Sequence, residues 1–218
     1  MTPRFHPDGS TLVSYAAGAL PQAIAILVAA HAEFCPACRA ELGVVRALAG
    51  ATLACAPVEP VADDAFERLS VRLGAEISPC APLPEPPDAA DLPAALARLV
   101  GGGTGAVAWR EVLPGIEHCR FVFPSARGES ALRLIRARPG REIPDHTHAG
   151  QETTLVLAGA LGDGDRVYRT GEFCDLDDTT THNPKVHGPE TCLCAIAEEG
   201  PPKFASPQVA AYLRQAGI

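Results

Sequence analysis

Residues 140–152 read Gly-Arg-Glu-Ile-Pro-Asp-His-Thr-His-Ala-Gly-Gln-Glu, and Gly159 follows after six more residues. Side chains alternate along a β-strand, so His146 and His148 project from one face and can bind a single ion. Glu152 lies an even number of positions beyond His148, across a short turn. Two imidazoles and a carboxylate at this spacing predict a metal site in the C-terminal half of the chain.

A third imidazole follows downstream. Gly171 opens another apolar-polar stretch over residues 172–176, and His182 comes after it. With His182, the site would offer three nitrogens and one oxygen, a set that suits zinc, iron, manganese, nickel or copper. His187 and Glu190, a few residues further on, are the alternatives to His182 as the last ligand. The sequence leaves the identity of the metal open.

The spacing G-x5-H-x-H-x3-E-x6-G, followed by a later histidine, resembles the cupin metal motif. The first half of the motif matches fully. In the second half, Asp177 and Thr179 stand where the usual pattern has proline and glycine, although His182 keeps its spacing. The resemblance implies a barrel of antiparallel strands with the metal ligands pointing inward, where the barrel shields them.

The rest of the C-terminal half supports antiparallel strands independently. Strand-like runs occur at 107–113, 118–123, 131–137, 153–158 and 191–197. Prolines and glycines separate these runs, at the spacing expected of antiparallel sheets. In the last run, Cys192 and Cys194 lie on the same face of the strand. They are either small buried residues or oxidisable thiols near the metal. A final helix is predicted from Pro207 to about Gln215.

Composition and charge narrow the class of protein. The chain has 218 residues, of which 47% are hydrophobic and 20% charged, enough for a core in one large domain or two modest ones. A net charge of −8 argues against direct binding to nucleic acid or to a membrane surface and favours a protein partner. The apolar segment 19–32 is too short to span a bilayer and lacks the basic start of a signal peptide. These features predict a cytoplasmic protein, in which eight cysteines indicate metal or redox chemistry rather than disulfides.

The chain divides at a proline-rich segment. Residues 78–93 contain six prolines, which remove backbone donors and favour extended geometry, so we expect a linker there. The pattern before the linker is helical, and the pattern after it is mostly strand-like. The sequence therefore predicts an α+β protein of two domains: a small helical bundle over residues 1–77 and an antiparallel β-barrel over residues 94–218.

The first domain shows four helical patterns. Ser10 is the predicted cap of the first helix, and later helices are expected at 22–34, 36–53 and 62–77. The apolar stripe of the fourth helix consists of Phe66, Leu69, Leu73 and Ile77. A short helix must bury such a stripe, either within its own bundle or against a partner protein.

Residues 31–38, His-Ala-Glu-Phe-Cys-Pro-Ala-Cys, could hold this small bundle together. His31, Cys35 and Cys38 are spaced so that one side of a helix and its turn presents all three to one tetrahedral ion. A closed structural site needs a fourth ligand, and His6 is the histidine left in this half. A structural zinc contributes roughly 10–16 kcal/mol in small peptides, enough to decide whether such a domain folds. The alternative is a Cys-x-x-Cys redox pair.

A histidine near the N-terminus, followed by H-x3-C-x2-C on a small helical domain, resembles the zinc-binding anti-sigma family. Joined to a C-terminal cupin domain, the arrangement is similar to the ChrR-type anti-sigma factors, which hold an extracytoplasmic-function sigma factor inactive. The resemblance covers nearly the whole chain. It implies one zinc site at His6, His31, Cys35 and Cys38, and a second zinc site at His146, His148, Glu152 and His182.

The same resemblance implies that the fourth helix contacts the sigma factor and that the cupin half responds to oxidative stress, with singlet oxygen as the expected signal. It implies a regulator and not an enzyme. The alternative is a cupin metalloenzyme, a dioxygenase or isomerase, with the helical zinc domain as an accessory. Such an enzyme has no evident use for a zinc-dependent helical module with a solvent-facing apolar helix, which favours the regulator.

Overall fold

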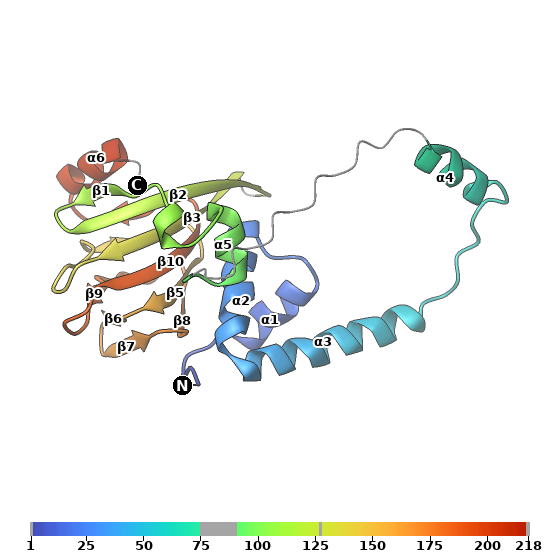
Figure 1. The fold of residues 1–218 in the computed structure, drawn as a ribbon, viewed down its shortest axis with the longest axis horizontal. Helices are drawn as coiled ribbons and strands as arrows, with labels where there is room; N and C mark the ends of the chain where they lie inside the picture. The colour runs from blue at the N-terminus through green and yellow to red at the C-terminus, as the bar shows by residue number, and fades with distance from the viewer. Residues whose placement is uncertain (1, 75–90, 127, 217–218) are drawn as a thin grey trace.

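Helices precede strands along the chain, as the sequence predicts (Figure 1). The computed structural model describes residues 2–74, 91–126 and 128–216. Of the proline-rich segment, residues 78–90 lie outside this described part. Just after it comes α5 (Ala94–Val100), a short helix that the strand-dominated pattern of the C-terminal half did not reveal.

The N-terminal helices, residues 9–54, begin with α1 (Gly9–Ala16). Asp8 caps α1, because its carboxylate accepts a hydrogen bond from the Thr11 backbone N–H at 2.6 Å. The predicted Ser10 cap is therefore wrong: Ser10 lies in the first turn and donates its hydroxyl to Asp8. The next helix, α2 (Gln22–Phe34), has the predicted bounds.

A single residue, Cys35, separates α2 from the long α3 (Pro36–Ala54). Its Sγ accepts from the Cys38 backbone N–H at 3.4 Å, so the thiol caps the helix. The predicted third helix is confirmed, one residue longer at its end.

The fourth helix, α4 (Ala65–Gly74), is shorter than the predicted 62–77, whose last three residues are not described. It lies away from the other helices (Figure 1) and has no buried residue. Phe66 is 81% exposed and Leu73 61%. Burial of this stripe within the helical bundle, one of the two alternatives, is therefore wrong for the part of the helix that the structure describes.

In the part of the chain that the structure describes, the strands form three sheets. The large sheet has six antiparallel strands, in the order β1 (Arg110–Leu113), β2 (Ile116–Ser125), β3 (Gly128–Ala137), β10 (Cys192–Glu199), β5 (Glu152–Ala158) and β8 (Phe173–Leu176). A second sheet orders β7 (Arg166–Arg169), β6 (Ala160–Asp163) and β9 (Lys185–Val186), and a third pairs β11 (Lys203–Phe204) with β4 (His146–Thr147). The expected antiparallel strands are confirmed, although hydrogen bonding does not run unbroken around a closed barrel. The last helix, α6 (Pro207–Ala216), is where it was predicted.

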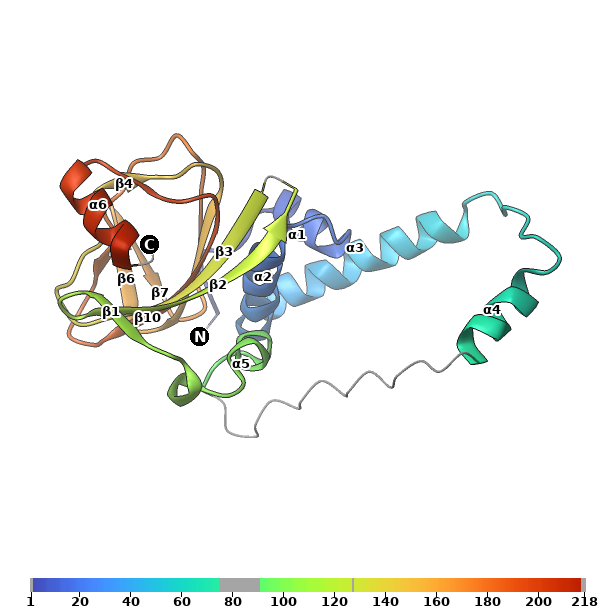
Figure 2. The same ribbon diagram turned by 90° about the horizontal axis from the view of Figure 1, so that it is seen from above.

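The two faces of the large sheet have different partners. Leu155 on β5 and Ala195 on β10 belong to one apolar cluster with Leu27 of α2. Their strand neighbours Val156 and Cys194 belong to a second cluster on the opposite face, inside the β domain (residues 110–204). Figure 2 shows α2 beside β2 and β3, while α3 extends away from the sheet. The N-terminal helices and the β domain therefore share a hydrophobic core.

Among residues 2–74, 91–126 and 128–216, no single helix is both long and apolar enough to cross a bilayer. The helices α2 and α3 pass that test only when taken together, across a bend of 119°.

Candidate metal centres

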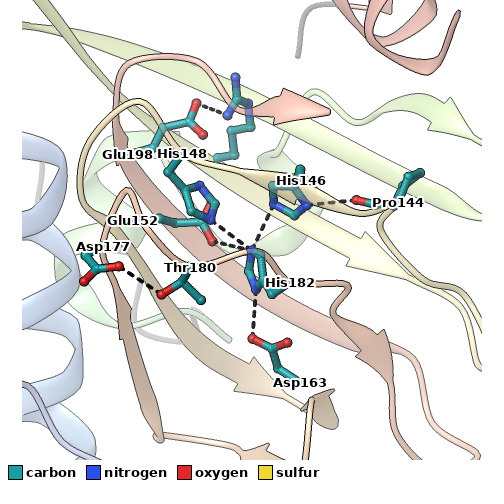
Figure 3. Close-up of polar contacts among 10 residues, drawn as sticks. Pro144, His146, His148, Glu152, Asp163, Asp177, Thr180, His182 and Glu198 are labelled. Atoms are coloured by element: carbon teal, nitrogen blue, oxygen red, sulfur yellow. Dashed lines mark hydrogen bonds and ion pairs between the residues drawn. The ribbon is translucent and has the colours of Figure 1, made fainter. Parts of the chain in front are cut away.

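The three histidines and the glutamate predicted from the cupin-like motif meet inside the β domain. Each of His146, His148, Glu152 and His182 offers one ligand atom, and these atoms all lie within 4.8 Å of one another. Their side chains point toward a common centre (Figure 3). Three of the four are buried and His182 is half-buried. We call this set the His3Glu cluster.

Backbone pairing brings the distant His182 to the others. The backbone N–H and C=O of His146 and His182 exchange two hydrogen bonds of 3.1 Å, which forms an isolated antiparallel bridge. The turn before His182 is held by Asp177, whose carboxylate accepts hydrogen bonds from the Thr179 backbone N–H at 3.0 Å and from the Thr180 hydroxyl at 2.9 Å (Figure 3). This carboxylate shapes the loop where the usual motif has proline and glycine.

The alternatives to His182 do not join the cluster. His187 and Glu190 are both exposed. His182 is the residue that joins His146, His148 and Glu152, because its ligand atom lies within 4.8 Å of theirs.

Hydrogen bonds on the far side of two rings direct nitrogen lone pairs into the cluster. His146 Nδ1 lies 2.9 Å from the Pro144 carbonyl oxygen, and His182 Nδ1 lies 2.8 Å from Asp163 Oδ2, so each Nδ1–H donates. The Nε2 atoms of these two rings then carry lone pairs, and they face each other at 3.0 Å. Two lone pairs at this distance repel unless a cation or a proton lies between them. The arrangement suits a metal ion.

The electrostatics of the cluster favour the neutral, metal-binding form of two imidazoles and require a cation beside the carboxylate. Burial lowers the pKa of His146 and of His148 to about 4, so both imidazoles are neutral at physiological pH. Burial also raises the pKa of Glu152 to about 7. His148 Nδ1 lies 3.2 Å from Glu152 Oε2. A divalent ion would supply the positive charge that this buried carboxylate needs.

Asp163 is a member of the site that sequence reasoning missed. It ends β6, and no motif in the sequence links it to the histidines. Its carboxylate orients His182 through the 2.8 Å contact with Nδ1 (Figure 3). A carboxylate behind a metal-binding imidazole fixes the tautomer and raises the basicity of the ligand. Only the folding of β6 next to the His182 loop reveals this role.

Replacing Asp163 by alanine is expected to weaken metal binding at the His3Glu cluster by about 10- to 100-fold, the usual effect of losing such a partner. The dissociation constant can be measured by competition with a chelator of known affinity. Asp165→Ala, two positions away and exposed, is the matched control and should leave the affinity unchanged. Equal affinities for the Asp163 variant and the unmodified protein would mean that Asp163 does not position His182.

The second predicted group of ligands also meets. His6, His31, Cys35 and Cys38 each offer one ligand atom, and these atoms lie within 4.8 Å of one another. His6 Nδ1 is 3.4 Å from both the Cys35 and the Cys38 sulfur, and His31 Nε2 is 3.3 Å from the Cys38 sulfur. His6 is exposed, and the other three residues are buried. We call this set the His2Cys2 cluster.

The chemistry of the His2Cys2 cluster favours zinc over a redox pair. Burial and the neighbouring Cys35 raise the pKa of Cys38 to about 12, so a cation is needed to hold the Cys38 sulfur as a thiolate. Two imidazole nitrogens lie close to these sulfurs. A dithiol that works by disulfide exchange does not need such nitrogens. Two sulfurs and two nitrogens in a closed set form a typical structural zinc site.

The β domain contributes directly to the His2Cys2 cluster. His31 Nδ1 donates to the carbonyl oxygen of Gly171 at 2.8 Å, which turns the Nε2 lone pair of His31 toward the cysteines. Gly171 has a φ of +84°, and a Cβ there would lie 2.9 Å from the Cβ of Phe34. Glycine thus permits the backbone before β8 to approach the end of α2. No local sequence pattern could have predicted this long-range contact.

Comparisons with known proteins agree with this architecture. The family model described as the ChrR Cupin-like domain matches residues 99–200. The anti-sigma-E factor ChrR of Cereibacter sphaeroides is 32% identical over 208 residues, which cover 94% of this chain and 94% of the relative. The chain belongs to the ChrR family of anti-sigma factors.

A solved structure supports the same assignment. The ChrR chain in the crystal structure of Rhodobacter sphaeroides SigE in complex with the anti-sigma ChrR superposes with a TM-score of 0.74 at 29% identity, covering 91% of this chain and 100% of that chain. The resemblance inferred from the two motifs is confirmed, and so is the order of a helical part followed by a cupin-like part. ChrR membership favours a regulator over the alternative of a cupin metalloenzyme.

Proposed function

We propose that this protein sequesters an extracytoplasmic-function sigma factor and releases it under oxidative stress sensed through the cupin domain. The observation that carries the first part is the similarity, over 91% of the chain, to ChrR in complex with SigE. A sigma factor acts with RNA polymerase, so the protein would work in the cytoplasm. The unit that binds sigma would be residues 1–77, with residues 78–93 as linker and residues 94–218 as sensor.

The two clusters would have different tasks. In the N-terminal part, His6, His31, Cys35 and Cys38 would hold a zinc ion that stabilises the helices. In the cupin domain, His146, His148, Glu152 and His182 would hold a second divalent ion, for which zinc is our proposal. A bound ion would supply positive charge that ties β4, β5 and the loop before β9 together.

The surface that meets the sigma factor would include α4. Its stripe of Phe66, Leu69 and Leu73 is exposed and touches no buried core in the described chain. A helix with such a stripe has little stability of its own, because burial of the apolar side normally supplies it. Docking of this stripe into an apolar groove of a sigma factor would give α4 the missing contacts.

Changing Leu69 to serine is expected to weaken the complex with the sigma factor about tenfold or more, through the loss of one buried leucine side chain. The matched control is Val71→Ser, because Val71 is 71% exposed but lies on another side of α4. Co-purification of the full-length protein with the sigma factor and titration calorimetry would measure both affinities. Equal weakening by the two substitutions would remove the apolar stripe from the interface.

A short structural route connects the two clusters. Glu152 opens β5 and pairs with Leu176 of β8 across the sheet. At the other end of the same pairing, Leu155 lies opposite Phe173, whose ring centroid is 5.7 Å from that of His31. Displacement of β5 or β8 at the His3Glu cluster would thus reach the backbone that holds His31. We propose this route for transmission of the signal to the N-terminal helices.

Oxidative stress is the proposed signal, with singlet oxygen as the oxidant. Histidine reacts readily with singlet oxygen, and oxidation of His146 or His148 in an intact, metal-bound site would displace the strands around the ion. Cys192 and Cys194 are buried on β10, and Cys194 lines a cavity with Glu152. These thiols are the second candidates for the oxidised group.

A further inference from the structure

Three consecutive residues where β8 begins, Gly171, Glu172 and Phe173, contact the segments that carry both histidines of the His2Cys2 cluster. The Gly171 carbonyl oxygen accepts a hydrogen bond from His31. The other two residues contact the chain just before His6, Glu172 through its side chain and Phe173 through its backbone N–H. The β domain therefore supports both imidazoles, and Glu172 is the charged member of this set.

The carboxylate of Glu172 is buried and fully hydrogen-bonded. Only 3% of the residue is exposed. Oε1 accepts from the Arg4 backbone N–H at 3.0 Å and from Arg4 Nε at 3.2 Å, while Oε2 accepts from the Arg169 backbone N–H at 2.7 Å. A buried carboxylate is costly unless it is paired and hydrogen-bonded. Arg4 supplies the opposite charge and two of these three donors, so the carboxylate holds the N-terminal segment in place.

The segment before His6 depends on the β domain for its position. It forms no helix or strand of its own, and chain ends without regular structure are poorly ordered unless they are tied down. After Arg4, the Phe5 carbonyl oxygen accepts from the Phe173 N–H at 3.1 Å, and the Phe5 ring centroid lies 4.8 Å from that of Tyr168. Each residue spans at most about 3.6 Å, so fixing Arg4 and Phe5 leaves little freedom to His6.

We propose that Glu172 is a positioning residue for the metal of the His2Cys2 cluster: by holding Arg4, it keeps His6 beside the two cysteine sulfurs. His6 Nδ1 lies 3.4 Å from both sulfurs, although His6 itself is exposed. An exposed ligand has little packing around its ring, and the backbone must therefore place it. This inference rests on the proposed zinc site and adds to it a carboxylate that touches none of the four ligands.

Backbone contacts extend this support to β5. The Val156 N–H donates to the Glu172 carbonyl oxygen at 3.1 Å, and the Val156 carbonyl oxygen accepts from the Gly171 N–H at 2.8 Å. Val156 lies on the same strand as Glu152 of the His3Glu cluster. A displacement of β5 would thus reach His6 through Glu172, in addition to reaching His31.

Glu172→Ala in the full-length protein should weaken metal binding at the His2Cys2 cluster about 10- to 100-fold, the range typical of residues that orient a ligand. Cobalt(II) is the probe, because cysteine ligands give a sulfur-to-cobalt charge-transfer band to which the His3Glu cluster does not contribute. Competition with a chelator gives the affinity. Arg4→Ala keeps its backbone N–H and should have a smaller effect. The control Glu142→Ala removes an exposed ion pair with Lys185 and should leave the affinity unchanged.

A variant without His6 separates positioning from a general effect on the fold. In His6→Ala protein, adding Glu172→Ala should cause no further loss of affinity, because no imidazole is left for it to position. The same loss with and without His6 would show that Glu172 acts on the fold or on His31, and would refute the proposal. An unchanged affinity in the single variant Glu172→Ala would refute it as well.

Two further arms keep the outcome clear. Arg4 has a side chain that is 66% exposed, so the same comparison with Arg4→Ala serves if Glu172→Ala does not fold. A sulfur-to-cobalt band that is missing from the unmodified protein would remove the zinc site itself, and the role of Glu172 with it. A normal band whose stability is independent of both Arg4 and Glu172 would leave the zinc site standing and overturn this inference alone.

Discussion

Replacing Cys38 with serine is expected to release zinc from the His2Cys2 cluster and to unfold α1, α2 and α3. The Cys38 sulfur lies within 3.4 Å of both His6 and His31, so its loss removes the ligand that contacts both imidazoles. A structural zinc is worth roughly 10–16 kcal/mol in small domains, more than a short helical bundle gains from its own core. The β domain should stay folded, because its strands pair with one another independently of the cysteines.

Hydrogen exchange resolved by segment, together with zinc analysis, would measure this effect. Amides of residues 9–54 should lose protection in the Cys38 variant, while those of β3, β5 and β10 keep most of theirs. Some loss in β5 and β10 is expected, since α2 covers Leu155 and Ala195 on their outer face. The control is Cys55→Ser, at the exposed end of α3.

The result would also decide whether zinc holds the inhibitory part of the protein together. If the sigma factor is bound through the N-terminal helices and α4, the Cys38 variant should leave its promoters active without any stress. A variant that has lost zinc but keeps protected amides over residues 9–54 would show that packing on the β domain suffices for the fold. The cluster would then have another role.

The residues that meet in each cluster could be named from the sequence for a physical reason, and their binding of metal stays a prediction. Ligands that share a helix turn or a strand have their geometry set by local periodicity, as for Cys35 with Cys38 and for His146 with His148. His182 was found because the motif resembles a known one, although Asp177 and Thr179 depart from it. In this chain the turn is held by hydrogen bonds to the Asp177 carboxylate instead of by proline and glycine.

Interactions between segments far apart in the chain could not be predicted in this way. Asp163 approaches His182 only because β6 and the loop before β9 fold together. Likewise, the sequence predicted a helical domain and a β domain but did not show that α2 and the β domain share one core. The buried residues of α2 lie on one broad face of the helix, which another element must cover. That pattern does not say which surface provides the cover.

Substitution of either Glu152 or His148 is expected to uncouple sensing from inhibition. The variants Glu152→Gln and His148→Ala each remove a buried ligand of the His3Glu cluster, while every residue of the His2Cys2 cluster and of α4 stays in place. Both variants should therefore still bind the sigma factor. Neither should release it, because the proposed route begins with damage to an intact metal site on β4 and β5.

The measurement is transcription from the promoters of the sigma factor, with and without singlet oxygen. The unmodified protein should show induction, and both variants should stay near the uninduced level. Glu190→Gln is the matched control, because it makes the same chemical change at an exposed loop residue outside the cluster, and it should respond normally.

The opposite behaviour is also informative. High transcription without stress in both variants would mean that the metal keeps the protein in its inhibitory form, so that any loss of the ion is itself the signal. Normal induction in both would exclude the His3Glu cluster from sensing. The thiols of Cys192 and Cys194 would then be the next groups to substitute, because they lie on the same inner face of β10.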